Sequence, residues 1–182
     1  MKKLFLALLA TLALTNCSKD NNDLPSNPAD QLPPATTIGA NKVGCLVNGE
    51  VYLPKGSNPF GAPLVTCYYQ YVNYGFEFGL GFTNNSIGLR GITILSNKLE
   101  FVQGQTYIIK NEQTENSVYA FFTLENNQGY RTTESFVGTL KITKLDLISN
   151  IISGTFSFDA IKINSGEVIE IREGRFDMQY SP

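Results

Sequence analysis

Three carboxylates in the last quarter of the chain are the residues best placed to do chemistry. Asp159, Glu170 and Asp177 lie in segments that alternate apolar and polar residues, and the intervening turn would bring Asp159 opposite Glu170 or Arg172. Paired carboxylates serve in general acid–base catalysis and in glycoside cleavage. Because Arg172 and Arg175 are close by, solvated ion pairs are the simpler interpretation. An enzyme that uses these carboxylates is therefore our third-ranked hypothesis, and we expect no catalytic residues.

The composition removes several other kinds of site. The chain has no histidine and no tryptophan, so Ser–His–Asp and Cys–His catalysis and histidine-containing zinc sites are excluded. No stretch has the alternating acidic residues and glycine of an EF-hand loop. The sequence therefore predicts no metal and no cofactor.

Two cysteines could form a disulfide bond. Cys45 shares a strand face with Val43 and Val47, and Cys67 shares one with Val65 and Tyr69. A bond between them would stabilise the fold by roughly 3 kcal/mol in the chain-entropy model. The sequence does not give their separation, so a disulfide and two buried free thiols remain equal alternatives.

Aromatic residues are concentrated in one pair of strands. They are Tyr68, Tyr69, Tyr71, Tyr74, Phe76, Phe78 and Phe82. Period-two alternation places Phe76, Phe78 and Phe82 on one face, which favours a core role. Tyr68 lies opposite the Cys67 face, and Tyr74 lies in a turn. These two tyrosines are the candidate contact surface.

The N-terminus predicts a lipid anchor. Lys2 and Lys3 precede an apolar run over residues 4–14, and Leu14-Thr15-Asn16-Cys17 resembles the lipobox of bacterial lipoproteins. We therefore expect a signal peptide over residues 1–16 and lipidation at Cys17. The run of eleven apolar residues is too short to cross a hydrocarbon core of about 30 Å as a permanent helix.

A change in composition divides the mature chain. Ser18-Lys19-Asp20 and the residues after it are similar to the tag of surface-exported lipoproteins, which favours the outer face of the outer membrane. Prolines and polar residues continue to residue 41, so residues 17–41 are expected to be a flexible tether and residues 42–182 the globular domain. Of 14 Lys and Arg, two leave with the signal, and the remaining 12 face 16 Asp and Glu, for a net charge of −4. Nucleic acid is therefore not an expected partner.

The sequence pattern of residues 42–182 is typical of β-structure throughout. Period-two patterns separated by turn signals predict strands at 42–47, 50–53, 64–72, 76–82, 89–95, 106–110, 117–124, 130–133, 136–143, 151–163, 168–172 and 175–180. Asn48-Gly49 is a hairpin signal, and several glycines fall inside strands, which favours a curved sheet. We predict one antiparallel all-β sandwich or barrel-like domain of about nine to eleven strands.

Three segments, residues 38–49, residues 152–158 and Glu173-Gly174-Arg175-Phe176-Asp177, resemble a family of small Bacteroidetes-type outer-membrane lipoproteins of unknown function. The resemblance implies a fold and a location but no activity. Our first hypothesis is a non-enzymatic module on the cell surface that binds a glycan, an envelope component or another protein. A structural envelope protein is the alternative, as is a carrier of a small apolar ligand if the sheet closes into a barrel.

Overall fold

The computed structural model describes residues 27–58, 61–86, 88, 90–111, 114–125 and 129–182. Within these ranges the chain forms eleven β-strands and one short 3-10 helix, which confirms the prediction of an all-β domain. The elements are η1 (Pro28–Gln31), β1 (Lys42–Val47), β2 (Glu50–Tyr52), β3 (Val65–Val72), β4 (Gly75–Asn84), β5 (Arg90–Asn97), β6 (Thr106–Lys110), β7 (Ser117–Leu124), β8 (Gly129–Arg131), β9 (Gly138–Asp146), β10 (Ile151–Lys162) and β11 (Glu167–Gln179).

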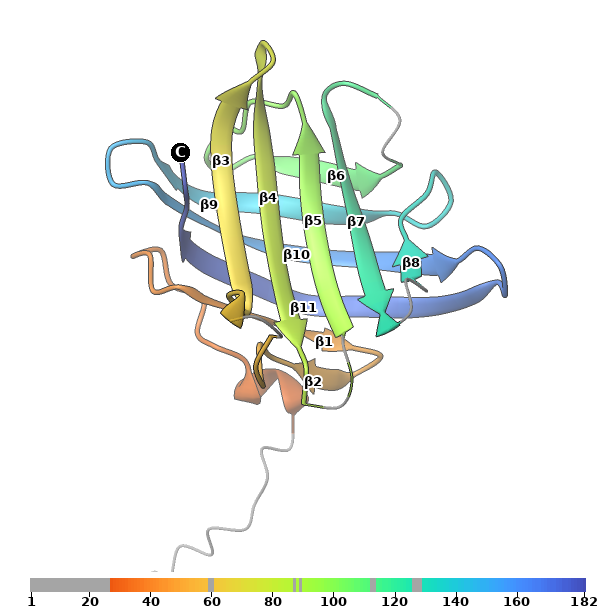
Figure 1. Cartoon of the computed structure of the whole chain (residues 1–182). Helices are drawn as coiled ribbons and strands as arrows, with labels where there is room; N and C mark the ends of the chain where they lie inside the picture. Colours follow the sequence, from red (N-terminus) through yellow and green to blue (C-terminus); the bar gives the residue numbers. More distant parts are fainter. Residues whose placement is uncertain (1–26, 59–60, 87, 89, 112–113, 126–128) are drawn as a thin grey trace, which may run out of the picture.

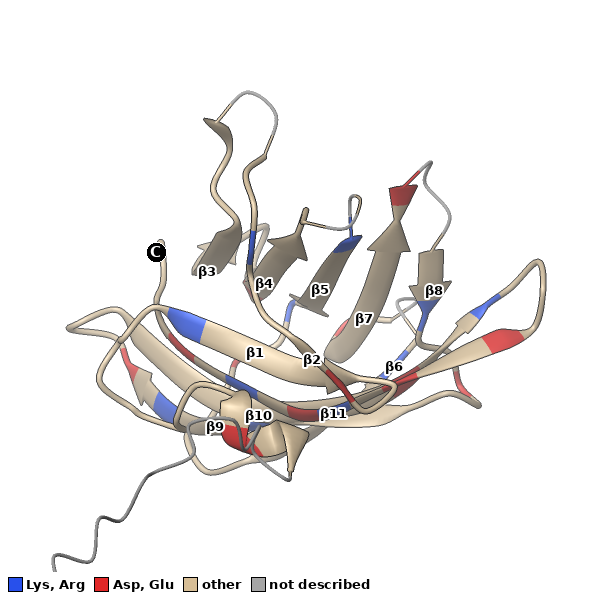
Figure 2. Cartoon of the chain, turned by 90° about the horizontal axis from the view of Figure 1, so that it is seen from below, with Lys and Arg blue, Asp and Glu red and all other residues tan. Residues whose placement is uncertain are grey.

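The strands form one sheet that folds over into two layers. The hydrogen-bonded order is β2-β1-β11-β10-β9-β6-β7-β5-β4-β3, and β8 pairs with β10 and β7. Strands β3, β4, β5 and β7 make one layer, and β9, β10, β11 and β1 make the other, with the two sets of strands crossing at a steep angle (Figure 1). Seen from below, the two layers face each other (Figure 2). Strand β6 joins the layers by pairing antiparallel with β9 and parallel with β7, which makes the sheet mixed.

On the side of the fold away from β6, the residues that follow β11 connect the two layers. The backbone N–H of Ser181 donates to the carbonyl of Cys67 at 3.0 Å, and the N–H of Tyr69 donates to the carbonyl of Ser181 at 3.0 Å. These two bonds attach the chain after β11 to the outer edge of β3. The result is a sandwich that is nearly closed into a barrel.

Large side chains fill the space between the layers. Phe78, Leu80 and Phe82 of β4 have at most 1 % of their surface exposed, as their period-two spacing predicts. The ring of Phe78 lies 6.0 Å from that of Phe176 in β11, and the ring of Phe82 lies 6.3 Å from that of Phe156 in β10. Aromatic contacts at these centroid distances join the two layers directly.

The last two predicted strands are one strand. β11 runs continuously through Glu173 and Gly174, where the sequence pattern suggested a break. The pairing with β1 shifts between Gly44 and Leu46, and the pairing with β10 shifts between Phe156 and Phe158. The shift with β1 lies opposite Glu173 and Gly174, and the shift with β10 lies opposite Arg172 and Glu173. The interruption in the pattern is therefore a β-bulge within the strand, and Glu173 belongs to both shifts.

The folded part begins before Lys42, which corrects the predicted boundary. Leu32 is only 6 % exposed, and together with Pro33 it lies above Gly44 of β1. Residues 36–40 are hydrogen-bonded to Asp177 of β11. The prolines and polar residues of residues 32–41 predict that this segment belongs to the tether. They nevertheless form a strap across the outside of the sheet, because one apolar side chain and a buried carboxylate provide contacts for them.

Candidate functional site

Two of the three predicted carboxylates lie side by side and share one arginine. Asp159 of β10 is directly opposite Glu170 of β11, as predicted. The guanidinium of Arg172 lies 2.6 Å from an oxygen of Asp159 and 3.7 Å from an oxygen of Glu170. All three side chains are well exposed. The arrangement is thus a solvated ion-pair cluster, with the arginine between the two carboxylates, and such exposed pairs contribute little to stability.

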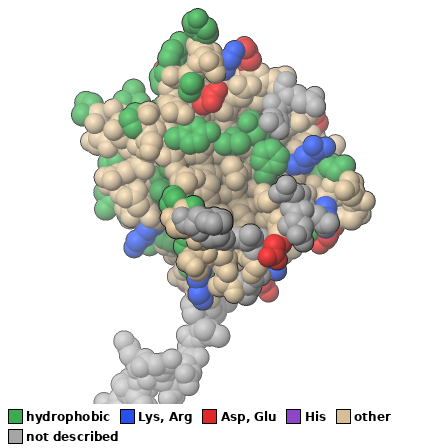
Figure 3. Space-filling view, viewed as in Figure 1, with side chains coloured by type: hydrophobic (Ala, Val, Ile, Leu, Met, Phe, Trp, Pro, Cys, Tyr) green, Lys and Arg blue, Asp and Glu red, His purple; other side chains and the backbone are tan. Residues whose placement is uncertain are grey.

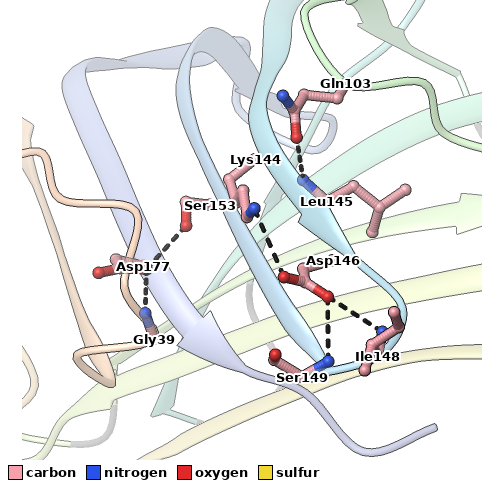
Figure 4. Close-up of polar contacts among 9 residues, drawn as sticks. All are labelled: Gly39, Gln103, Lys144, Leu145, Asp146, Ile148, Ser149, Ser153 and Asp177. Carbon is pink, nitrogen blue, oxygen red and sulfur yellow. Dashed lines mark hydrogen bonds and ion pairs between the residues drawn. The ribbon is translucent and has the colours of Figure 1, made fainter.

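The third carboxylate, Asp177, is apart from the other two and buried. It is 2 % exposed and accepts hydrogen bonds from both sides (Figure 4). The donors are Ser153 Oγ at 2.7 Å, Thr36 Oγ1 at 2.6 Å, and the backbone N–H groups of Gly39 at 2.8 Å and of Ile38 and Ala40 at 3.1 Å. Burial by itself would raise the pKa of this carboxyl, but the bonds from Thr36, Ser153 and the backbone outweigh burial and lower the pKa to about 2. Asp177 therefore holds the N-terminal strap on the sheet.

Both predicted cysteines are buried and both are free thiols. Cys45 lies in β1 and Cys67 in β3, on the inner faces of the sheet, as the sequence pattern indicated. Burial raises the pKa of both thiols, so they are poor nucleophiles. They act as small apolar side chains of the core.

The two predicted contact tyrosines do not lie together. Tyr74 is at the tip of the β3–β4 hairpin and 94 % exposed. Tyr68 points outward from the middle of β3, across its neighbour Gly79 in β4. A Cβ atom at position 79 would lie 2.2 Å from the ring of Tyr68, so the glycine makes room for the ring to lie across the strand. Desolvation, followed by the charge of Glu77, raises the pKa of the Tyr68 hydroxyl, which stays protonated.

Tyr68 belongs to a row of side chains that crosses the outer face of the β3-β4-β5-β7 layer. The strand register places Tyr68, Gly79, Leu95 and Tyr119 opposite one another in turn, and we call these four residues the outer row. Phe121, two residues beyond Tyr119, contacts it edge-on at 5.7 Å. In Figure 3 hydrophobic side chains form a band across this face. Adjacent strands are about 4.8 Å apart, so the row spans roughly 14 Å from β3 to β7.

The polar residues beside the outer row are mostly uncharged. Thr66, Gly81 and Thr93 form the next row on one side. Gln70 and Glu77 form the adjacent pair on the other side. The face therefore combines aromatic rings with hydroxyl and amide groups. Gly79 and Gly81 add no side chains that would project from it.

A groove continues the outer row past the edge of β3. It has a volume of about 500 Å³, and Tyr68 lies on its border with the row. Its polar lining consists of Asn41, Thr66, Gln70, Gln179 and Ser181. None of the described residues that line it carries a charge. We call this opening the edge groove, and its size is within the range of sites for small ligands.

Sequence reasoning identified Tyr68 but missed the rest of this surface. The alternation in β5 and β7 places Leu95, Tyr119 and Phe121 opposite the buried residues, but it does not show which strands are neighbours. The edge groove could not be predicted, because Asn41 and Gln179 come from opposite ends of the domain.

Comparison with known proteins gives no relative. No family model, no curated protein and no solved structure matches the chain. Among the residues that the structure describes, no helix is long and apolar enough to cross a membrane. The same residues contain no cluster of three or more Cys, Asp or Glu side chains that could hold a metal ion.

Proposed function

We propose that this protein is a non-enzymatic binding module, anchored to the outer membrane through Cys17, that holds a neutral glycan on the outer row and in the edge groove. The observation that carries the proposal is the continuity between an aromatic row and an uncharged groove. Sugar rings present flat apolar faces and a rim of hydroxyl groups. Tyr68, Leu95 and Tyr119 would contact the faces, and the amides and hydroxyls of the groove would bind the rim.

The charge distribution supports a neutral ligand. In Figure 2 acidic and basic residues are interspersed along the ribbon of the described strands. A neutral site of this kind favours ligands that are recognised by stacking and hydrogen bonds. Of the two alternatives, a carrier of a small apolar ligand is the less well supported. Buried rings such as Phe78, Phe156 and Phe176 fill the interior where such a ligand would bind.

Glycan binding is tested with the full chain and one pair of tyrosine variants. The full chain is screened on an array of bacterial and host polysaccharides, and the affinity for any retained glycan is measured by calorimetry. Tyr68→Ala removes a ring from the row and should weaken binding about tenfold. Tyr74→Ala removes an equally large exposed ring outside the row and should leave the affinity unchanged. If the array retains nothing, or if both variants bind like the parent, the proposal is wrong.

The anchor is tested separately by fractionating cells. Cys17→Ala should move the protein from the membrane fraction to the soluble fraction, because stable anchoring requires the acyl chains. Protease added to intact cells should cleave the parent protein if it faces outward. A protein that stays whole while a known surface marker is cut would show that the module faces the periplasm.

A further inference from the structure

The bulge in β11 holds a residue in an unfavourable backbone conformation. Glu173 has φ of +53°, a left-handed conformation that glycine adopts at little cost and that other residues adopt rarely. Such residues cost on the order of 1 kcal/mol or more and are often found at functional sites. The position calls for an explanation of why a glutamate is present.

Local structure does not supply that explanation. The next residue, Gly174, is required by packing, since a Cβ there would lie 2.4 Å from the ring of Phe156. At position 173 a glycine would relieve the strain instead. The side chain of Glu173 is 59 % exposed, and its ion pair with Arg175 has a separation of 3.5 Å. An exposed pair of this kind offsets little of the strain.

The bulge borders a polar groove on the outer face of the β9-β10-β11 layer. This bulge groove has a volume of about 340 Å³ and is lined by Thr139, Thr155, Ser157, Glu173 and Arg175, with Ala35 of the strap as one wall. The hydroxyls of Thr139 and Ser157 are 3.4 Å apart and lie on neighbouring strands. A bulge commonly re-aims a side chain toward a site, and here it places a carboxylate beside three hydroxyls and a guanidinium.

We propose that the bulge groove is a second binding site, which takes a single neutral sugar unit. A carboxylate accepts hydrogen bonds from adjacent sugar hydroxyls, while the guanidinium and the threonine and serine hydroxyls donate to sugar oxygens. The two charges of the groove cancel, so it offers no net attraction to an anion. The groove lies on the layer opposite the outer row, and the protein would thus bind carbohydrate on both faces.

The test uses the full chain and follows the backbone amide signals of residues 139, 155, 157 and 174 by NMR. The probes are methyl β-D-glucopyranoside, methyl β-D-galactopyranoside and N-acetyl-D-glucosamine at millimolar concentrations. We expect saturable shifts of these signals with at least one probe. Glu173→Gln should weaken that binding about tenfold, since a charge-assisted hydrogen bond is lost. Glu170→Gln alters an exposed carboxylate outside the groove and should leave binding unchanged.

A second variant distinguishes a binding role of Glu173 from a purely structural role. Glu173→Gly should raise the midpoint of thermal unfolding, because the strain is relieved, and should abolish the shifts. The inference is overturned if none of the three probes gives saturable shifts, or if the shifts persist in both Glu173 variants. Because Tyr68→Ala should leave these signals unaffected, failure of the outer row and failure of the bulge groove give different results.

Discussion

At the scale of single residues, Asp177 makes stability depend on pH in the acid range. The pKa of this carboxyl falls from 3.8 to about 2 on folding, so the charged form is favoured in the folded protein. The resulting stabilisation, about 2 kcal/mol, is fully present above pH 4 and is lost as the pH falls through 2. Urea unfolding of the parent and of Asp177→Asn should therefore differ most near neutral pH. The difference should shrink toward pH 2, and a constant difference would contradict the role of the carboxylate.

Glycines inside strands differ in what they tolerate. A Cβ at Gly138 would lie 2.1 Å from the carbonyl oxygen of Ser157, which belongs to the backbone of β10 and cannot move aside easily. We expect Gly138→Ala to lower the free energy of unfolding by about 2 to 4 kcal/mol. At Gly91 the nearest atom is the Thr83 methyl at 3.3 Å. Gly91→Ala in β5 is therefore the matched control and should change stability by less than about 1 kcal/mol.

At the scale of elements, the β3–β4 turn carries a residue that does not suit its backbone. Asn73 and Tyr74 both have positive φ, of 48° and 67°, which is the pattern of a type I′ turn. Glycine is preferred at the second position, and the tyrosine ring there is almost fully exposed. Tyr74→Gly should relieve about 1 to 2 kcal/mol of left-handed strain. The greater entropy of the unfolded chain offsets part of this gain, so the free energy of unfolding, measured by urea denaturation, should rise by about 0.5 to 1 kcal/mol. A loss of stability would mean that the ring makes a contact in solution.

The positions of the strands along the sequence could be predicted better than the order in which the strands lie side by side in the sheet. Period-two alternation located β1, β3, β4, β7 and β10 closely, because each has one face in the core. It could not identify the bulge at Glu173, since a bulge and a turn interrupt alternation in the same way. The outer row depends on register across four strands, and register is set by contacts between segments far apart in the sequence.

The composition of the strap was misleading for a similar reason. Prolines and polar residues are typical of tethers, and residues 34–40 have no apolar pattern. Their order depends on one carboxylate about 140 residues away, Asp177. A local pattern cannot reveal a partner at that distance. The same limit applies to the edge groove, which combines Asn41 with Gln179.

At the scale of the whole molecule, the strap should contribute measurably to stability. A chain that begins at Lys42 loses the burial of Leu32 and leaves the Asp177 carboxylate without four of its five donors. Compared with a chain that begins at Asn27, it should be less stable by about 3 to 5 kcal/mol. Equal unfolding midpoints for the two chains would show that the strap is dispensable.

The bonds of Ser181 also fix the order of events during folding. The edge of β3 is covered by a residue made more than one hundred positions later, and Asp177 meets Thr36 across 141 residues. Contacts of such high sequence separation form slowly, because a long loop must close first. Until residue 181 has joined the fold, β3 presents an open edge that can pair with other chains. Chains truncated before residue 181 should therefore aggregate or be degraded, while a chain that includes Ser181 can close its sheet.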